Sequence, residues 1–169
     1  IKDILPPNSV IVNKSTLPVG TASQLKKQIQ RTDVEIVSNP EFLSEGNAVQ
    51  DFLQPSRIVI GAESQEAASS VAALFKDIDA TTQITGTESA ELIKHTANAF
   101  LAMKLTFINE IATLCELVGA NVLDVAEGIG YDPRIGSTYL RPGPGWGGSC
   151  FPKDSSSLLQ TANKAGFDF

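Results

Sequence analysis

The first half of the chain alternates short apolar runs with stretches that fit helices. Apolar runs rich in β-branched residues predict strands at 10–15, 34–40, 56–62 and 82–86. The segments between them predict helices at 20–31, 46–53 and 64–79. Strand–helix alternation of this kind favours a parallel α/β sheet.

The second half follows a different pattern. Between Thr87 and about Val118 there is no proline or glycine, so this stretch predicts one long helix with Thr87 as its N-cap and Gly119 as its end. At roughly 1.5 Å per residue the helix would be about 48 Å long, which indicates a helix that links or pairs larger parts. A second helix is expected at 121–129. After a long loop, a last helix is expected with Pro152 in its first turn.

Composition narrows the class of protein. The 169 residues suffice for one domain or for parts of two. No apolar run approaches the roughly 20 residues of a membrane-spanning helix. Two cysteines are too few for a disulfide framework, which fits a reducing cytoplasm, and a single histidine argues against a structural zinc site. The formal charge of −6 argues against nucleic acid as a partner but leaves room for an anionic small ligand.

The two cysteines lie in contrasting surroundings. Cys150 belongs to the glycine- and proline-rich stretch GPGWGGSCFPKD, just before the expected last helix, where the helix dipole and Lys153 would favour its thiolate. Its glycine neighbours let backbone N–H groups approach a ligand closely. We therefore expect Cys150 to be a nucleophile rather than an incidental loop cysteine. Cys115 has core-face spacing on the long helix and is expected to be plain packing.

The same stretch contains a literal G-x-G-x-x-G match at Gly143, Gly145 and Gly148. The dinucleotide fingerprint requires a buried strand before the first glycine and a helix that opens on the third. Here YLRP precedes the match, and Pro142 and Pro144 would spoil the turn. A loop that closes on a substrate is the better interpretation.

Polar side chains at two other places are candidates for a cleft. Lys94 and Asn98 lie four apart on the long helix, so they share a face and could aim two donors into a cleft, with a solvated helix face as the plainer alternative. Glu41 and Glu45 directly follow an expected strand, at the edge where parallel sheets bind ligands. The alternative for this pair is two acids at the start of a helix.

Single residues complete the set of candidates. Thr16 follows the first strand, where a hydroxyl can hold a water or a cofactor. Arg134 and Arg141 supply positive charge to the long loop, and ordinary surface is the alternative for all three residues. His95 is assigned to surface or packing.

Four motifs in order resemble those of the nucleotide-sugar dehydrogenases, most closely the UDP-glucose 6-dehydrogenase branch: KSTLPVG, SNPEFLSEGNAVQDF, ELIKHTANAFLAMKLTFINEIA and GIGYDPRIGSTYLRPGPGWGGSCFPKD. The resemblance implies that residues 1–86 are the C-terminal part of a Rossmann-like NAD-binding domain. It implies that residues 87–169 are part of a central helical domain, which carries the catalytic cysteine and forms a homodimer through the helix 87–118. It also implies that the family's glycine-rich NAD unit and its nucleotide-holding third domain lie outside this chain.

The resemblance further implies roles in a twofold oxidation of UDP-glucose at carbon 6, with two NAD⁺ and one water. Cys150 corresponds to the nucleophile and Glu41 to the general base for thioester hydrolysis. The remaining residues fall into implied groups: oxyanion donors (Lys94, Asn98), holders of a catalytic water (Thr16, Asp154), cofactor contacts (Glu45, Lys153, Thr16) and substrate contacts (Leu43, Lys94, Asn98, Tyr139, Gly147 and, from the neighbouring subunit, Arg134).

Two alternatives stay open at this point. GDP-mannose dehydrogenases share the GGSCxPKD pattern, so another nucleotide sugar is the second candidate substrate. A non-catalytic helical dimerisation module is the alternative outside the enzymes. In either case we expect the isolated chain to be inactive by itself, because it lacks the dinucleotide fingerprint.

Overall fold

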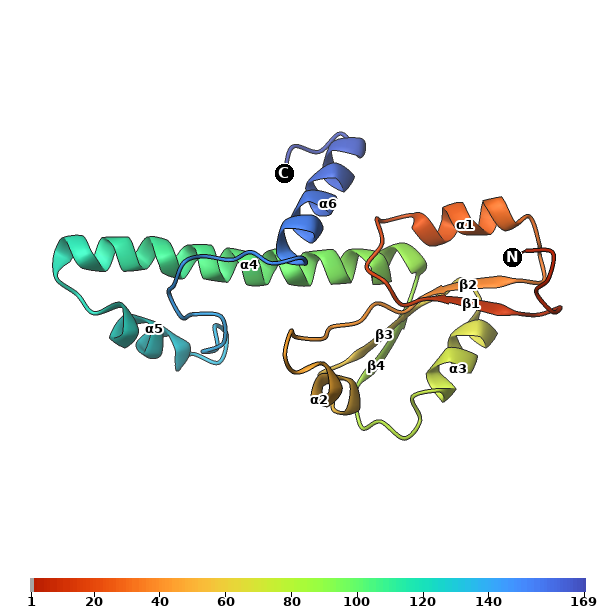
Figure 1. The fold of residues 1–169 in the computed structure, drawn as a ribbon, viewed down its shortest axis with the longest axis horizontal. Coiled ribbons are helices and arrows are strands. Elements are labelled where there is room, and N and C mark those ends of the chain that lie inside the picture. Colours follow the sequence, from red (N-terminus) through yellow and green to blue (C-terminus); the bar gives the residue numbers. More distant parts are fainter. Residues whose placement is uncertain (1) are drawn as a thin grey trace. The chain divides into compact units, whose positions relative to one another are not determined.

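The computed structural model describes residues 2–169 (Figure 1). The chain divides into two compact units: the first contains the residues up to His95 together with Thr161–Phe169, and the second contains Thr96–Gln160. The long helix α4, Thr87–Val118, contributes residues to both units.

A four-stranded sheet forms the centre of the first unit, in the order β1-β2-β3-β4 (Figure 1). Its strands are β1 (Val10–Asn13), β2 (Glu35–Ser38), β3 (Ile58–Gly61) and β4 (Thr82–Thr85). The pair β1–β2 and the pair β3–β4 are parallel, whereas β2 and β3 are antiparallel and meet only at Ser38 and Gly61. The expected α/β class is confirmed, but the sheet is mixed rather than purely parallel.

The connections explain the mixed pairing. Each parallel pair is joined by a helix that returns the chain to its starting edge: α1 (Thr21–Ile29) joins β1 to β2, and α3 (Gln65–Ala73) joins β3 to β4. Between β2 and β3 the chain forms only an irregular loop and the short α2 (Ala48–Leu53). Without a full crossover helix between them, β2 and β3 do not run in parallel, and they pair through their last residues, Ser38 and Gly61.

Helix α3 ends earlier than its apolar pattern suggests. It stops at Ala73 instead of continuing to residue 79, and the chain goes on in tight turns in which the Ile78 N–H donates to the Phe75 carbonyl at 2.9 Å. Phe75 and Ile78 still pack against the buried cluster around Val37 and Ile60. Apolar residues therefore continue at helix-like spacing beyond Ala73 because they pack against the core, although the chain is no longer helical there.

Gly61 is the point where the sheet and α4 approach most closely. A Cβ atom built on Gly61 would lie 2.5 Å from the Ala90 Cβ and 2.9 Å from the Thr87 Cα. The backbone of β3 thus packs directly against the first turn of α4. This contact fixes the start of the helix that carries Lys94.

Three helices make up the rest of the chain: α4, α5 (Val122–Gly130) and α6 (Phe151–Lys164). Gly119 ends α4 with a left-handed φ of 75°, as expected for a glycine stop. Thr87 is the first residue of α4 rather than its cap. Pro152 lies in the first turn of α6, as predicted.

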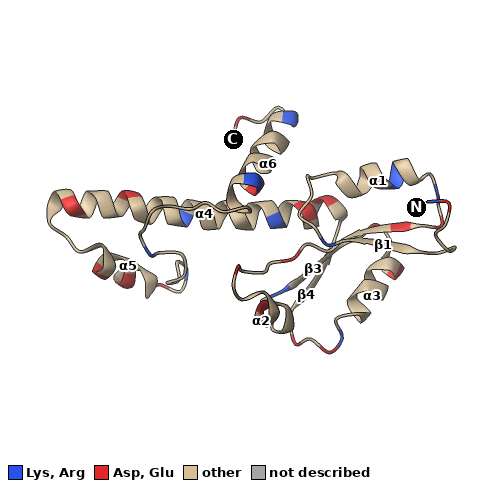
Figure 2. Ribbon diagram, in the orientation of Figure 1, with Lys and Arg blue, Asp and Glu red and all other residues tan. Residues whose placement is uncertain are grey.

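The second unit buries few large side chains. Ile108 and Cys115 of α4 are buried, as are Leu140 and Leu158. In α5, which the structure describes in full, no residue is buried. Figure 2 shows that acidic residues gather on α5 and on the distal part of α4.

Candidate functional site

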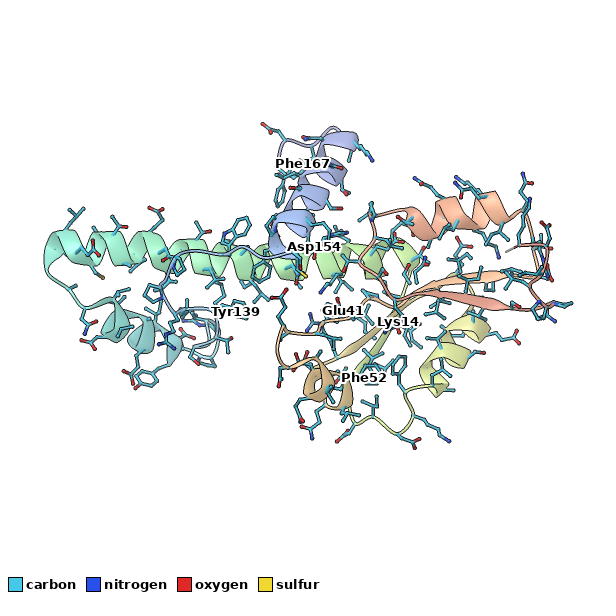
Figure 3. All side chains as sticks on the ribbon, viewed as in Figure 1. Lys14, Glu41, Phe52, Tyr139, Asp154 and Phe167 are labelled. Atoms are coloured by element: carbon cyan, nitrogen blue, oxygen red, sulfur yellow. The ribbon has the colours of Figure 1, made fainter. Side chains whose placement is uncertain are left out.

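Lys94 lies buried in the first unit, with 4 % of its surface exposed. Its ammonium Nζ is 3.7 Å from the Glu41 carboxylate, which the loop after β2 carries. Glu41 also accepts a hydrogen bond of 2.6 Å from the Leu43 N–H. The solvated-face alternative for Lys94 is wrong, because Lys94 is buried and forms an ion pair with Glu41, which is labelled in Figure 3.

The Phe42 ring connects this pair to a second cation. The Lys94 Nζ lies 5.3 Å from the ring centroid, and the Arg57 guanidinium carbon lies 3.8 Å from the same centroid. Burial lowers the pKa of Arg57. Sequence reasoning missed both Phe42 and Arg57, and the only available signal was a cation placed directly before an apolar strand.

Asn39 anchors the start of the same loop. Its side-chain amide donates to the Val59 carbonyl at 2.7 Å, and its oxygen accepts from the Lys14 ammonium at 2.8 Å. Burial also lowers the pKa of Lys14. Lys14, Glu41 and Phe52 line a cavity of about 260 Å³ in this unit (Figure 3).

The acids of this loop do not start a helix. Helix α2 begins only at Ala48, so the helix-start alternative for Glu41 and Glu45 is wrong. Glu45 and Ser44 are exposed, and Leu43 is 37 % exposed. The loop therefore presents Leu43 and Glu45 outward, while Glu41 turns to Lys94.

The loop after β1 is held by two buried residues of α4. The His95 Nε2 atom lies 2.8 Å from the Leu17 carbonyl, which confirms a packing role for His95. The Glu91 carboxylate accepts from the Gly20 N–H at 2.6 Å and from the Ala22 N–H at 2.9 Å. Glu91 thus caps α1, so its N-terminus is already taken by an internal anion and is not available to a phosphate.

In the second unit, Cys150 is exposed and directly precedes α6. Its carbonyl accepts the first helical hydrogen bond, from the Asp154 N–H, at 2.9 Å. Asp154 is fully buried and accepts from the Asn98 amide at 2.6 Å and from the Lys153 ammonium at 2.5 Å. One N–H of the Asn98 amide remains for another acceptor, because an amide nitrogen carries two hydrogens.

The glycine-rich loop before Cys150 is tied to α4. The Trp146 indole N–H donates to the Thr106 hydroxyl at 2.8 Å, and the Gly143 N–H donates to the Asn109 side chain at 3.0 Å. The element directly before this loop is the helix α5 and not a strand, so the dinucleotide fingerprint is excluded here. A Cβ at Gly147 would meet nothing within 4 Å, which leaves space beside the backbone.

Aromatic side chains surround the start of α6. Tyr139 and Trp146 each make an edge contact with Phe151, with ring centroids 6.3 Å and 6.5 Å apart. Tyr139 adopts a left-handed φ of 62°, which is uncommon for a residue with a side chain. The residue next to Cys150 is therefore framed by two rings.

Arg134 points to solvent in this chain. Its side chain is 87 % exposed and forms an ion pair with Asp132 at 2.6 Å, which raises the pKa of Arg134 and lowers that of Asp132. Thr16 is half-buried in the first unit. The roles implied for Arg134 and Thr16 stay predictions.

Residues 2–169 contain neither a candidate metal site nor a candidate membrane-spanning helix. No group of three or more histidine, cysteine, aspartate or glutamate side chains is placed to hold a metal ion there. Within the same residues, every helix is too short or too polar to cross a bilayer.

Comparison with known proteins decides the family. Residues 1–79 match the NAD binding domain of the UDP-glucose/GDP-mannose dehydrogenase family, and residues 88–169 match the central domain of the same family. The chain belongs to this family.

Individual relatives agree. The chain is 51 % identical over 165 residues to the UDP-glucose 6-dehydrogenase TuaD of Bacillus subtilis, covering 95 % of this chain and 36 % of that protein. It is similar to the structure of a UDP-glucose dehydrogenase from Pyrobaculum islandicum, with 39 % identity and a TM-score of 0.88 over 94 % of this chain and 38 % of that one. A ternary complex of GDP-mannose dehydrogenase from Pseudomonas aeruginosa gives 31 % identity and a TM-score of 0.69 over 94 % of this chain and 39 % of that one.

The family members are much longer than this chain. The chain spans a little over a third of the curated relatives that it matches. Its two matched segments explain the change from an α/β pattern to a helical one near Thr87.

Proposed function

We propose that the whole protein is an NAD-dependent UDP-glucose 6-dehydrogenase, which oxidises carbon 6 of UDP-glucose twice to form UDP-glucuronate. The observation that carries the proposal is the exposed Cys150 directly before α6, next to the buried Asp154 that binds Asn98 and Lys153. Relatives in three genera are named as enzymes of this specificity, at 42–52 % identity.

The first oxidation converts the alcohol to an aldehyde. NAD⁺, when bound, accepts the hydride from carbon 6 in each of the two oxidations. In the first, the hydroxyl proton passes to a water held by Thr16 and Asp154. Lys94 and Asn98 supply N–H donors for the oxygen as negative charge develops on it. Removal of one such donor typically costs roughly 10²–10³ in kcat.

Cys150 then captures the aldehyde covalently. The thiolate forms a C–S bond to carbon 6, and the carbonyl electron pair moves to the oxygen, giving a thiohemiacetal. Loss of the second hydride from carbon 6 converts it to a thioester. The attachment also keeps a reactive aldehyde from escaping between the two oxidations.

Hydrolysis completes the cycle. Glu41 accepts a proton from water while the water oxygen attacks the thioester carbon. The C–S bond then breaks, the thiolate of Cys150 leaves, and the product carries a carboxylate. The 3.7 Å contact between Glu41 and Lys94 supports this role, because it holds the Glu41 carboxylate beside the donor proposed for the developing oxyanion.

The chain supplies only part of a cofactor site. Helix α1, which follows β1, is capped by Glu91, so its N-terminus does not receive a phosphate. The glycine-rich loop at 143–148 follows the helix α5 instead of a strand. Neither segment by itself fits a dinucleotide. Glu45, Lys153 and Thr16 are the proposed contacts from this chain. We expect the isolated chain to form no NADH.

We further propose a cytoplasmic homodimer built on α4. In the second unit, α4 exposes six large apolar side chains, each more than half accessible: Phe100, Met103, Phe107, Leu114, Leu117 and Val118. A second copy would cover them with the same surface, as in other twofold interfaces. In such a dimer Arg134 would serve the neighbouring subunit.

The test is substrate oxidation by the full-length protein. It should oxidise UDP-glucose and leave GDP-mannose unchanged at equal concentration. Oxidation of GDP-mannose alone would support the second candidate, which the similarity to a GDP-mannose dehydrogenase favours. Failure to oxidise either sugar would leave only the dimerisation module.

A further inference from the structure

We propose that Arg57 is a positioning residue, which holds the Glu41–Lys94 pair in place by stacking on the Phe42 ring. This inference rests on the proposed function, because it assigns the catalytic pair to Glu41 and Lys94. Nothing in the mechanism above uses Arg57. Arg57 nevertheless stacks on the Phe42 ring, which also faces Lys94 and belongs to the residue directly after Glu41.

Arg57 is a cation without a carboxylate partner among the residues that the structure describes. Its guanidinium donates only to the neighbouring Ser56 hydroxyl, at 3.0 Å, and no acid of residues 2–169 forms an ion pair with it. Burial lowers its pKa, so the environment disfavours the charge. A half-buried arginine without a carboxylate partner needs another favourable interaction to offset the desolvation of its charge. The face of the Phe42 ring, with its centroid 3.8 Å from the guanidinium carbon, supplies one.

The position of Arg57 is fixed by the sheet. The next residue, Ile58, starts β3 and donates its N–H to the Thr81 carbonyl at 2.9 Å. All residues of β3 are buried. Arg57 therefore offers a rigid platform, in contrast to the loop at 40–47, which contains no helix or strand.

The Phe42 ring transmits this rigidity to the catalytic pair. Phe42 follows Glu41 in the chain, and the Lys94 ammonium lies 5.3 Å from its ring and 3.7 Å from the Glu41 carboxylate. If the ring moves, both contacts of Lys94 change together. Arg57 thus constrains the distance between the general base and the oxyanion donor.

The experiment uses the full-length protein with Arg57→Met, Arg57→Lys, Phe42→Leu and the double variant Arg57→Met with Phe42→Leu. Arg57→Met should lower kcat by roughly two- to thirtyfold, the range of a partly desolvated cation–π contact, with KM for UDP-glucose within about twofold. Arg57→Lys should retain most of kcat because it keeps the charge. The double variant should be no worse than Phe42→Leu alone, since both changes break one contact.

Two readouts separate positioning from general stability. Thioester hydrolysis should become rate-limiting in Arg57→Met, so an acyl adduct on Cys150 should accumulate and be seen by intact mass. Acylation of Lys94 by a hydroxysuccinimide ester, mapped by mass, should become at least about threefold faster, as expected for loss of a contact of this strength. Arg31→Met is the matched control, because Arg31 has its own partner in Asp33 and should change neither readout.

Each outcome decides one question. Unchanged kcat and unchanged Lys94 acylation in Arg57→Met, or equal effects in Arg31→Met, would overturn the positioning role. Additive losses in the double variant would also overturn it. If the wild-type protein leaves UDP-glucose unchanged, the proposed function fails, and Lys94 acylation still decides whether Arg57 holds the pair.

Discussion

The two units prepare their functional groups in opposite ways. In the first unit the charged groups are buried and partnered: Lys94 contacts Glu41, and Glu91 caps α1. In the second unit Cys150 lies exposed on a glycine-rich loop, and the buried groups near it in sequence or by contact are Asp154 and its donor Asn98. The first unit is preorganised for electrostatic work, whereas the second offers an accessible nucleophile.

The two units also differ in how much apolar surface they bury. The sheet of the first unit buries a continuous apolar cluster around Val37, Ile58 and Ile60. In the second unit α5 buries none of its residues, and α4 exposes Phe100 and Phe107. This exposed apolar face of α4 is the surface that the proposed second copy would cover. The comparison therefore predicts different responses to substitution in the two units.

The largest effect is expected at the nucleophile. Cys150→Ala in the full-length protein should reduce UDP-glucuronate formation by at least about 10³-fold, because no other group can form the thioester. Cys115→Ala should keep the activity and cost about 1–2 kcal/mol of stability, since Cys115 is buried in the second unit. Coupled assays and thermal melts measure the two effects. Equal losses of activity in Cys150→Ala and Cys115→Ala would contradict the assignment of Cys150 as nucleophile and Cys115 as packing.

The next effect tests the close contact between the sheet and α4. Gly61→Ala places a Cβ 2.5 Å from that of Ala90, so it should lower the free energy of unfolding by about 1–3 kcal/mol. Gly86→Ala is the matched control, because a Cβ there meets nothing within 4 Å, and it should change stability by less than about 1 kcal/mol. Urea unfolding compares them. A tolerated Gly61→Ala would show that β3 and α4 pack less tightly than this 2.5 Å approach requires.

A smaller loss is expected from the internal cap. Glu91→Gln places an N–H₂ group among the donors of Gly20, Ala22 and Ser38, all of which now donate to the carboxylate. One buried donor loses its acceptor, at a cost of about 1–2 kcal/mol. Glu66→Gln in the exposed first turn of α3 provides the control and should cost under about 0.5 kcal/mol. Similar melting shifts for both variants would contradict the capping role.

The smallest effect concerns a surface link in the first unit. The Ser23 hydroxyl donates to Glu88 at 2.6 Å, and this bond is the main reason that the pKa of Glu88 is lowered. A carboxyl with a lowered folded-state pKa stabilises the fold above its unfolded pKa, and the contribution is lost as the pH falls through the folded pKa. Ser23→Ala should therefore cost about 0.5 kcal/mol at pH 7 and progressively less as the pH falls through the folded-state pKa of Glu88. A pH-independent difference would point to packing instead.

Most elements could be predicted from the sequence because their patterns are local. The stretch from Thr87 to Val118 has no breaker, and Gly119 ends it, so its helix was predictable. The antiparallel pairing of Ser38 with Gly61 could not be predicted, because no local pattern records how two strands separated by a loop align. The early end of α3 was missed for a related reason: Phe75 and Ile78 reach the core from turns.

The candidate site was predicted unevenly. Cys150, Lys94 and Glu41 stand in recognisable motifs, and the structure places Lys94 next to Glu41. Arg57 and Glu91 escaped notice because their partners, Phe42 and Gly20, lie far away in the sequence. Only the folded arrangement of the first unit brings them together.

The most direct test of the account is the stoichiometry of the reaction. The full-length protein with limiting UDP-glucose should form two NADH for each sugar consumed, with UDP-glucuronate as the product. In Cys150→Ala any residual turnover should stop after the first oxidation. A single NADH per sugar in the wild-type protein, or two NADH per sugar in Cys150→Ala, would contradict covalent capture by Cys150.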